Sequence, residues 1–139
     1  LLFTRPMHSS EWSSILFNFY TNSKKAIYRK EGKGIIGIEC GVSEKMIYLE
    51  FSDNGIGIPE EYEERIFDEF FTTTSAMNYE DIDSVNAVLG TGLGLKIVKD
   101  IVESYKGRIF VTSPKNQFNT CIRVEIPMLD DKDFEKYGL

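Results

Sequence analysis

The segment that most restricts the possible folds lies near the start of the chain. From Ser9 or Ser10 to about residue 28 or 29, apolar residues recur at helical spacing: Trp12, Ile15, Leu16, Phe19, Ala26 and Ile27. We predict a helix that begins at one of the two serines, carries Glu11 in its first turn and is broken by Gly32 and Gly34. A helix with one apolar side needs a second layer to cover it.

Shorter periodic runs follow and predict that layer. They comprise two strands joined by a hairpin, a short helix, a second long helix and a final pair of strands, at residues 35–42, 46–52, 60–66, 95–105, 108–112 and 120–126. Neighbouring antiparallel strands combined with long helices predict an α+β two-layer sandwich and not a doubly wound parallel sheet. We also expect a short edge strand at residues 1–3 and a frayed tail from Leu129.

Size and charge limit the function classes. The 139 residues, 42% hydrophobic and 27% charged, suit one domain, with a core at about residues 8–127 and a charged tail at 128–139. The net charge of −6 disfavours nucleic-acid binding, which needs a basic surface, but permits a local basic pocket for a small polyphosphate. No apolar run approaches the roughly 20 residues of a membrane span, and no signal peptide is visible. We expect a cytoplasmic domain without membrane contact of its own, although the full-length protein could be anchored.

The two cysteines and the single histidine carry little functional signal. Cys40 and Cys121 are far apart and each lies in an apolar, strand-like run, which favours two buried reduced thiols over a disulfide or a metal pair. A structural zinc site would need four clustered ligands. His8 is expected to be a surface or capping residue.

A row of polar residues runs along the predicted first helix. At about 100° per residue, Glu11, Asn18, Asn22 and Lys25 fall within a sector of roughly 60° beside the apolar stripe. Asparagine is unfavourable inside a helix because its side chain competes for backbone hydrogen bonds. A solvated helix face is one explanation. The other is a metal and phosphate site, since an amide oxygen suits Mg²⁺ and a lysine meets phosphate as a point charge.

Two glycine-rich loops provide further candidates. Asp53 ends a strand and precedes Gly55 and Gly57, so it is either part of a tight turn or an acceptor for the exocyclic amine of adenine. The second loop, residues 89–95, alternates glycines just before a helix whose N-terminus attracts phosphate. It matches neither a P-loop nor a dinucleotide fingerprint, and a glycine-rich helix entry without ligand remains the alternative.

The region between the loops contains an aromatic cluster and a polar segment. Phe67, Phe70 and Phe71 precede three threonines at residues 72–74. The aromatic cluster either staples the loop to the core or anchors a mobile lid, from which the threonine hydroxyls could reach phosphate oxygens. The segment at residues 72–89 contains no lysine or arginine.

These segments, in this order, resemble the ATPase domain shared by sensor histidine kinases, gyrase, ninety-kilodalton heat-shock chaperones and mismatch-repair proteins, and most of all that of the histidine kinases. The matching boxes are the N box, the first glycine box, the F box and the second glycine box, at residues 11–26, 53–59, 65–71 and 90–95. The resemblance covers about residues 8–127. It implies the Bergerat fold, with helices on one face of a mixed, mostly antiparallel sheet.

The resemblance also implies a role for each matching residue. Asn22 coordinates Mg²⁺, Asn18 lies near the phosphates of ATP, and Lys25 contacts phosphate. Asp53 binds the adenine amine directly and through a water that Thr120 supports. Gly55 and Gly57 make room for the base, and the second glycine box shapes the end of the lid. The full set of implied nucleotide-binding positions in the loops is Gly55, Gly57, Ile58, Phe67, Phe70, Thr73, Gly90, Thr91, Gly92, Leu93 and Gly94.

The implied activity is protein histidine kinase. Asn18 stands where hydrolytic members carry a glutamate as general base, and an amide cannot accept a proton in that way. We therefore expect transfer of the γ-phosphoryl group of Mg-ATP to a histidine on a separate phosphoacceptor domain, in cis or in trans, with a response regulator downstream. His8 is too near the N box to be that histidine. We expect the isolated domain to be a monomer and the full-length protein a homodimer.

Two other functions stay open. One is an ATP-gated conformational switch of the chaperone or gyrase type, which steady ATP turnover by the isolated domain would favour. The other is a non-catalytic regulatory module with a relic nucleotide pocket, whose thermal stability would not respond to Mg-ATP.

Overall fold

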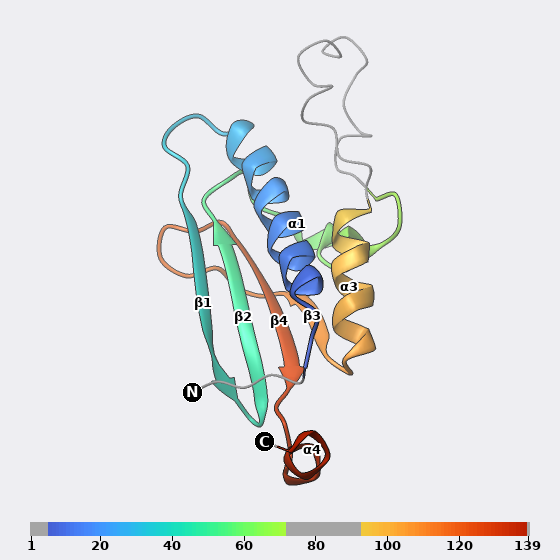
Figure 1. Cartoon of the computed structure of the whole chain (residues 1–139). Coiled ribbons are helices and arrows are strands. Elements are labelled where there is room, and N and C mark those ends of the chain that lie inside the picture. The colour runs from blue at the N-terminus through green and yellow to red at the C-terminus, as the bar shows by residue number, and fades with distance from the viewer. Residues whose placement is uncertain (1–5, 72–92, 139) are drawn as a thin grey trace.

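The computed structural model describes residues 6–71 and 93–138. Within them, a four-stranded sheet carries helices on one face, with α1 and α3 side by side (Figure 1). This is the α+β two-layer sandwich that the sequence predicts. The expected strand at residues 1–3 and the segment at residues 72–89 lie outside the described residues.

Helix α1 spans Ser9–Tyr28, as the apolar periodicity predicts. Its N-cap is His8 and not one of the serines. The backbone N–H of His8 donates to Glu11 Oε2 at 2.9 Å, which satisfies a donor at the helix start. The same carboxylate oxygen accepts a hydrogen bond from the Tyr105 hydroxyl at 2.5 Å. Glu11 therefore ties α1 to the end of α3 and is not free for a ligand.

The sheet has the order β1-β2-β4-β3, and all three pairings are antiparallel among the described strands. Strands β1 (Ile36–Ser43) and β2 (Met46–Asp53) form the predicted hairpin. Its turn residues, Glu44 and Lys45, both have positive φ, as a two-residue hairpin turn requires. Strands β3 (Arg108–Val111) and β4 (Thr120–Pro127) complete the sheet, and β4 pairs with β2 along the whole length of both.

The smaller elements differ from the sequence predictions. The short helix expected at residues 60–66 is two 3₁₀ turns, η1 (Glu60–Tyr62) and η2 (Arg65–Phe67). The long helix expected at residues 95–105 is confirmed to within one residue at each end, as α3 spans Gly94–Ser104. The tail expected to fray contains a helix, α4 (Asp131–Tyr137). Its N-cap carboxylate, Asp130 Oδ1, accepts from the Asp133 N–H at 2.8 Å, and Gly138 ends it in the left-handed conformation.

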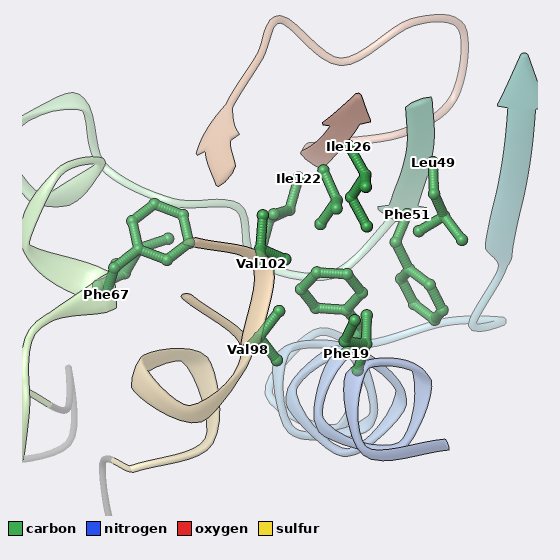
Figure 2. Close-up of a cluster of buried hydrophobic side chains, with 11 residues drawn as sticks. Phe19, Leu49, Phe51, Phe67, Val98, Val102, Ile122 and Ile126 are labelled. Carbon is green, nitrogen blue, oxygen red and sulfur yellow. The ribbon is translucent and has the colours of Figure 1, made fainter. Parts of the chain in front are cut away.

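The core lies between the two helices and the sheet (Figure 2). Phe19 of α1 stacks at a tilt on Phe51 of β2, with ring centroids 5.4 Å apart. Val98 and Val102 of α3 and the inward residues of β4 close the cluster. Because Phe19 is almost fully buried, these contacts fix the rotation of α1 about its axis, and with it the direction of the polar stripe.

The edge strand β1 explains the one wrong cysteine prediction. Cys121 is buried, but Cys40 is exposed, and both are free thiols. Cys40 pairs with Leu49 and so faces the helical side of the sheet. Its neighbours on that face, Ile38 and Val42, are 57% and 45% exposed. No helix among the described residues reaches over this edge, so an apolar strand pattern does not bring burial here.

The opposite face of the sheet carries a network of charges. The carboxylates of Glu50 and Glu125 are buried, and Arg123 lies between them at 2.8 Å from each. Lys115 also pairs with Glu50, and Arg108 with Glu125. Burial raises the pKa of both glutamates, but their hydrogen bonds and ion pairs outweigh it, and each pKa lies below the ordinary value. Both carboxylates therefore stabilise the fold above the ordinary carboxyl pKa, and this contribution is lost as the pH falls through the lowered values.

The network predicts a pH-dependent effect of Arg123→Met. Because the variant removes the shared partner of two buried carboxylates, we expect the free energy of unfolding at pH 7 to fall by about 2 kcal/mol. The loss should shrink as the pH approaches 4 and the carboxylates take up protons. Urea unfolding at several pH values measures both effects. Arg108→Met is the control, since Arg108 is 67% exposed and should contribute less than about 1 kcal/mol. A loss for Arg123→Met that does not vary with pH would contradict the assignment.

Candidate functional site

A cavity of about 250 Å³ opens beside α1, at the point where β2 ends and α3 begins. Its walls come from α1, from the ends of β2 and β4, from the loop after β2 and from the first turn of α3. The lining side chains at the α1 wall are Asn18, Phe19, Thr21, Asn22, Ser23, Lys25, Ala26 and Arg29. Asp53 and Thr120 line the sheet side. The stripe of α1 and the end of β2, which are far apart in sequence, thus share one cavity.

Asp53 is the last residue of β2 and is 4% exposed. Its Oδ2 accepts a hydrogen bond from the Ser23 hydroxyl at 2.7 Å, and its Oδ1 accepts from the Gly55 N–H at 2.9 Å. A carboxylate has about four acceptor positions, so these two bonds fix its orientation and leave room for a further donor. Thr120, its partner on β4, is also buried and lines the cavity.

The glycines after Asp53 have two different functions. A Cβ on Gly55 would lie 2.6 Å from both the carbonyl carbon and the Cβ of Ala26, so Gly55 allows α1 to approach the loop closely. The Ile56 N–H donates to the Ala26 carbonyl at 3.2 Å and reinforces this contact. Gly57 has a φ of +82° and lines the cavity. We expected both glycines to make room for a base, but Gly55 makes room for α1.

The polar residues of α1 that line the cavity differ in whether their side chains have hydrogen-bond or ion-pair partners. Asn18 donates from Nδ2 to the Ser14 carbonyl at 2.8 Å, which leaves its amide oxygen available. Asn22 has no hydrogen-bond partner in residues 6–71 and 93–138, and Lys25 has no ion pair with any of them. Burial lowers the pKa of the Lys25 ammonium group, and the positive charge of Arg29 lowers it further. An amide and a partly desolvated cation without partners are unfavourable unless a ligand supplies them.

The first turn of α3 closes the other end of the cavity. Gly94 begins α3, and a Cβ at this position would lie 2.6 Å from Asn18 Oδ1. The glycine therefore lets the N-terminus of α3 reach the amide of α1. Helix N-termini present unpaired N–H groups and partial positive charge. In this structure the N-terminus of α3 lies next to the Asn18 amide.

The other predicted site residues have mixed outcomes. Ile58 lines the cavity, and Leu93 is the N-cap residue of α3. Phe67 lies in the hydrophobic core, and Phe70 is 68% exposed, so neither lines the cavity. Their predicted contact with nucleotide has no support in the geometry; Phe71 lines the cavity in their place. Thr73, Gly90, Thr91 and Gly92 lie outside the described residues.

Several lining residues were missed at the sequence level. Ser23 looked like an ordinary helix residue, yet it orients Asp53. Ala26 and Arg29 lie four and seven positions after Asn22 and thus on the same side of α1. Helical spacing could have identified them, because residues three and four apart share a face.

Among the described residues, no cluster of three or more histidine, cysteine, aspartate or glutamate side chains could hold a metal ion. The lining residues do include two side-chain amides, those of Asn18 and Asn22. Such a set suits a cation that keeps its waters and takes most of its other ligands from a phosphate chain, as Mg²⁺ does.

Residues 8–130 match the family model of the histidine kinase-, DNA gyrase B- and HSP90-like ATPases. The chain belongs to this family. Its similarity is to the histidine kinase branch: it is 32% identical over 130 residues to the sensor protein kinase WalK of Staphylococcus haemolyticus, and 30% identical over 122 residues to WalK of Bacillus subtilis. These matches cover 89% and 87% of the chain but only 19% and 18% of the two kinases. The chain thus spans about a fifth of the length of these relatives.

Solved structures of histidine kinases share the fold. A mycobacterial sensor histidine kinase, MprB, superposes with a TM-score of 0.67 at 25% identity, over 88% of this chain and 73% of that chain. The catalytic domain of histidine kinase ThkA gives 0.61 at 27% identity, over 86% and 67%. This ATPase-family domain is therefore an ATP-binding catalytic domain of the histidine kinase type in fold and in sequence.

The contact between Gly94 and Asn18 can be tested by coupling. Gly94→Ala should lower the free energy of unfolding by about 1 kcal/mol, because the new methyl group meets the Asn18 amide. In an Asn18→Ala background the same change should be neutral or stabilising, since alanine is the better helix former by about 1 kcal/mol. Urea unfolding of the four proteins gives the coupling energy. Equal effects of Gly94→Ala in both backgrounds would contradict the contact.

Lys25→Met should separate stability from binding. The charged ammonium is disfavoured in the folded domain, so its removal should raise the melting temperature without nucleotide at pH 7. The gain should shrink as the pH rises toward the ordinary lysine value of 10.5 and vanish above it, where the amine is neutral in both states. Mg-ATP affinity should fall by about tenfold. Calorimetry measures both, with the exposed Lys24→Met as control. A variant that melts lower than the parent protein at pH 7 would contradict this account.

Proposed function

We propose that this domain binds Mg-ATP in the α1 cavity and transfers its γ-phosphoryl group to a histidine on a separate phosphoacceptor domain. The observation that supports the proposal most is the convergence of Asn22, Lys25 and Asp53 on one cavity. At one side lies an oriented acceptor for an amine, and at the other lie an unpartnered amide and an unpartnered cation.

The residues would divide the nucleotide between them. Asp53, held by Ser23 and Gly55, accepts from the exocyclic amine of adenine, with Thr120 beside it. Gly57 and Ile58 provide a wall against the base. Asn22 and the free oxygen of Asn18 face the metal and phosphate end, together with Lys25 and the first turn of α3. Bound Mg²⁺ would neutralise charge on the phosphate chain and favour displacement at the γ-phosphorus.

Because the described lining offers no carboxylate that is free to act as a general base, the cavity favours phosphoryl transfer over hydrolysis of ATP. Asp53 is the only carboxylate among the described lining residues, and its oxygens already accept from Ser23 and Gly55. Asn18 cannot take a proton from water. Phosphoryl transfer depends mainly on positioning and charge neutralisation, which this cavity can supply without a base of its own. An ATP-gated switch that turns over ATP would need one.

The context of the domain is part of the proposal. His8 caps α1 and does not line the cavity, so the acceptor histidine would belong to another domain, in cis or in trans. A response regulator would receive the phosphoryl group afterwards. No helix in the described part of the chain combines the length and apolar character needed to cross a membrane. We propose a cytoplasmic site, where ATP is available, a monomeric isolated domain and a dimeric full-length kinase.

Calorimetric titration with ATP, with and without Mg²⁺, tests the site. Asn22→Ala should remove most of the affinity that Mg²⁺ adds, at least about tenfold. Asp53→Asn should weaken binding with and without Mg²⁺ by about the same factor, because it acts on the base. Gln117→Ala, on an exposed loop outside the cavity, is the control. If both cavity variants bind ATP like the parent protein, the site assignment is wrong.

The reaction is tested with γ-labelled ATP. The intact protein that contains this domain should gain a label that is stable in alkali and labile in acid, as a phosphohistidine is. The isolated domain should release phosphate no faster than the Asn22→Ala variant. Steady turnover by the isolated domain would instead support the ATP-gated switch.

A further inference from the structure

Ser23 is a buried hydroxyl on the side of α1 that packs on the core and on the loop after β2. It lies about one helical turn after Phe19 and one before Ala26, and its exposed fraction is 4%. Alanine is almost as large, forms helices better and leaves no polar atom to satisfy in a buried position. Helix formation and packing therefore do not explain a serine here.

The hydrogen bond to Asp53 determines what the Ser23 oxygen can still offer. A serine hydroxyl has one proton and two lone pairs. The proton is donated to Asp53 Oδ2 at 2.7 Å, so while this contact is present the Ser23 oxygen can only accept further hydrogen bonds. Both residues line the cavity. Side by side, the two side chains therefore present acceptors to a ligand and no donor.

The groups next to this pair do not reverse its polarity. The Gly55 N–H is already donated to Asp53 Oδ1, at 2.9 Å. The side-chain amide nitrogen of Asn119 donates to the Gly55 carbonyl at 2.8 Å. Thr120, the partner of Asp53 on β4, has a hydroxyl that can either donate or accept, so it suits both kinds of ligand group. The acceptor character of this end of the cavity thus comes from Ser23 and Asp53.

An amino group and a keto group need opposite partners at this end of the cavity. The exocyclic amine of adenine has two N–H donors, whereas the keto oxygen at the same ring position of hypoxanthine or guanine only accepts. A buried site built from acceptors rejects the keto group, because two acceptors then face each other without a proton between them. Ser23 strengthens this rejection in two ways, since it holds Oδ2 of Asp53 in place and adds an acceptor of its own.

A purely structural role for the hydrogen bond is the other explanation, because the bond also ties α1 to the end of β2. Two further contacts serve the same purpose, the close approach of Ala26 to Gly55 and the Ile56 N–H on the Ala26 carbonyl. Neither needs a hydroxyl at position 23. A structural role would affect every ligand of the cavity equally, whereas a role in base selection depends on the group at position 6 of the purine.

We propose that Ser23 is a specificity-determining residue that positions Asp53 and makes the cavity selective for a 6-amino purine over a 6-oxo purine. This rests on the proposed function of the cavity. The hydroxyl at position 23, and not the carboxylate alone, then determines how strongly ATP is preferred over inosine triphosphate or guanosine triphosphate.

The test compares the Mg²⁺ complexes of ATP, inosine triphosphate and purine riboside triphosphate, which has hydrogen in place of the amine. The proteins are the parent, Ser23→Ala, Ser23→Cys and the control Ser104→Ala, whose exposed hydroxyl lies outside the cavity and donates to the Ile101 carbonyl at 2.6 Å. Calorimetry gives the affinities, and melting temperatures verify that each variant is folded.

We expect Ser23→Ala to lose about tenfold in Mg-ATP affinity and to change the affinity for purine riboside triphosphate by less than about twofold. The preference for ATP over inosine triphosphate should fall by about tenfold. Ser23→Cys, whose thiol is a weak donor, should lie between the parent protein and Ser23→Ala, and it provides the same comparison if Ser23→Ala does not fold. Ser104→Ala should match the parent protein.

The outcomes separate this proposal from the one it rests on. If the parent protein binds Mg-ATP and Ser23→Ala shows the same preference over inosine triphosphate, Ser23 does not select the base and the proposal is overturned, while the function stands. If Ser23→Ala weakens ATP and purine riboside triphosphate alike, the hydrogen bond only holds the fold, which also overturns it. If the parent protein does not bind Mg-ATP, the proposed function fails and this inference fails with it.

Discussion

The position of α1 against the end of β2 determines whether the cavity exists. Three contacts hold it: the hydrogen bond from Ser23 to Asp53, the Ile56 N–H on the Ala26 carbonyl, and the close approach of Ala26 to Gly55. A side chain at position 55 would push the helix away from the loop. The hydrogen bond from Ser23 that holds the helix also orients Asp53, so the fold and the proposed base-recognition group depend on one junction.

Helix α1 contributes to both the core and the cavity, because an apolar row and a polar row of side chains lie next to each other on its surface. Ile15 and Phe19 are almost fully buried, and Phe19 packs on Phe51. Next to them on the helix surface, Asn22 has no hydrogen-bond partner among the described residues, and Asn18 uses only its amide nitrogen, which donates to Ser14. The apolar stripe supplies the free energy that holds these polar groups at the edge of the core, since each buried aromatic side chain contributes about 1.5–3 kcal/mol. Binding groups of this kind are characteristically unfavourable for the unliganded fold.

The sequence predicted those parts of the molecule that follow from local pattern. The bounds of α1, the hairpin between β1 and β2, and the helical layer over an antiparallel sheet result from periodicity and turn chemistry. Long-range packing was less accessible. Cys40 lies in an apolar strand pattern but on an edge that no described helix covers, and Phe67 belongs to the core although its motif suggested a ligand. Helix α4 was missed because its capping acid, Asp130, reads as part of a charged tail.

A candidate site residue could be predicted from the sequence where its position depends on helical spacing within one element, and not where it depends on a contact between distant segments. The stripe of Asn18, Asn22 and Lys25 follows from helical spacing alone, and their common cavity with Asp53 was expected from the resemblance. Ser23 could not be identified, because its hydrogen bond to Asp53 joins residues 30 positions apart. The role of Gly55 likewise depends on how closely α1 approaches. A sequence motif specifies which residue types occur, whereas a tertiary contact decides whether a glycine serves a ligand or a neighbouring helix.

Charge at the cavity and charge of the whole chain have opposite signs, and both matter. The net charge of −6 repels extended polyanions, which would have to contact a large part of the surface. A small polyphosphate bound in the cavity is affected mainly by the charges of the residues that line it. At physiological ionic strength the screening length is about 8 Å, so acids elsewhere on the surface are largely screened, whereas Lys25 borders the cavity itself. Its charge acts at short range and in a partly desolvated setting, where Coulomb interactions are strongest. A negative net charge is thus compatible with a site that holds the triphosphate of a single nucleotide.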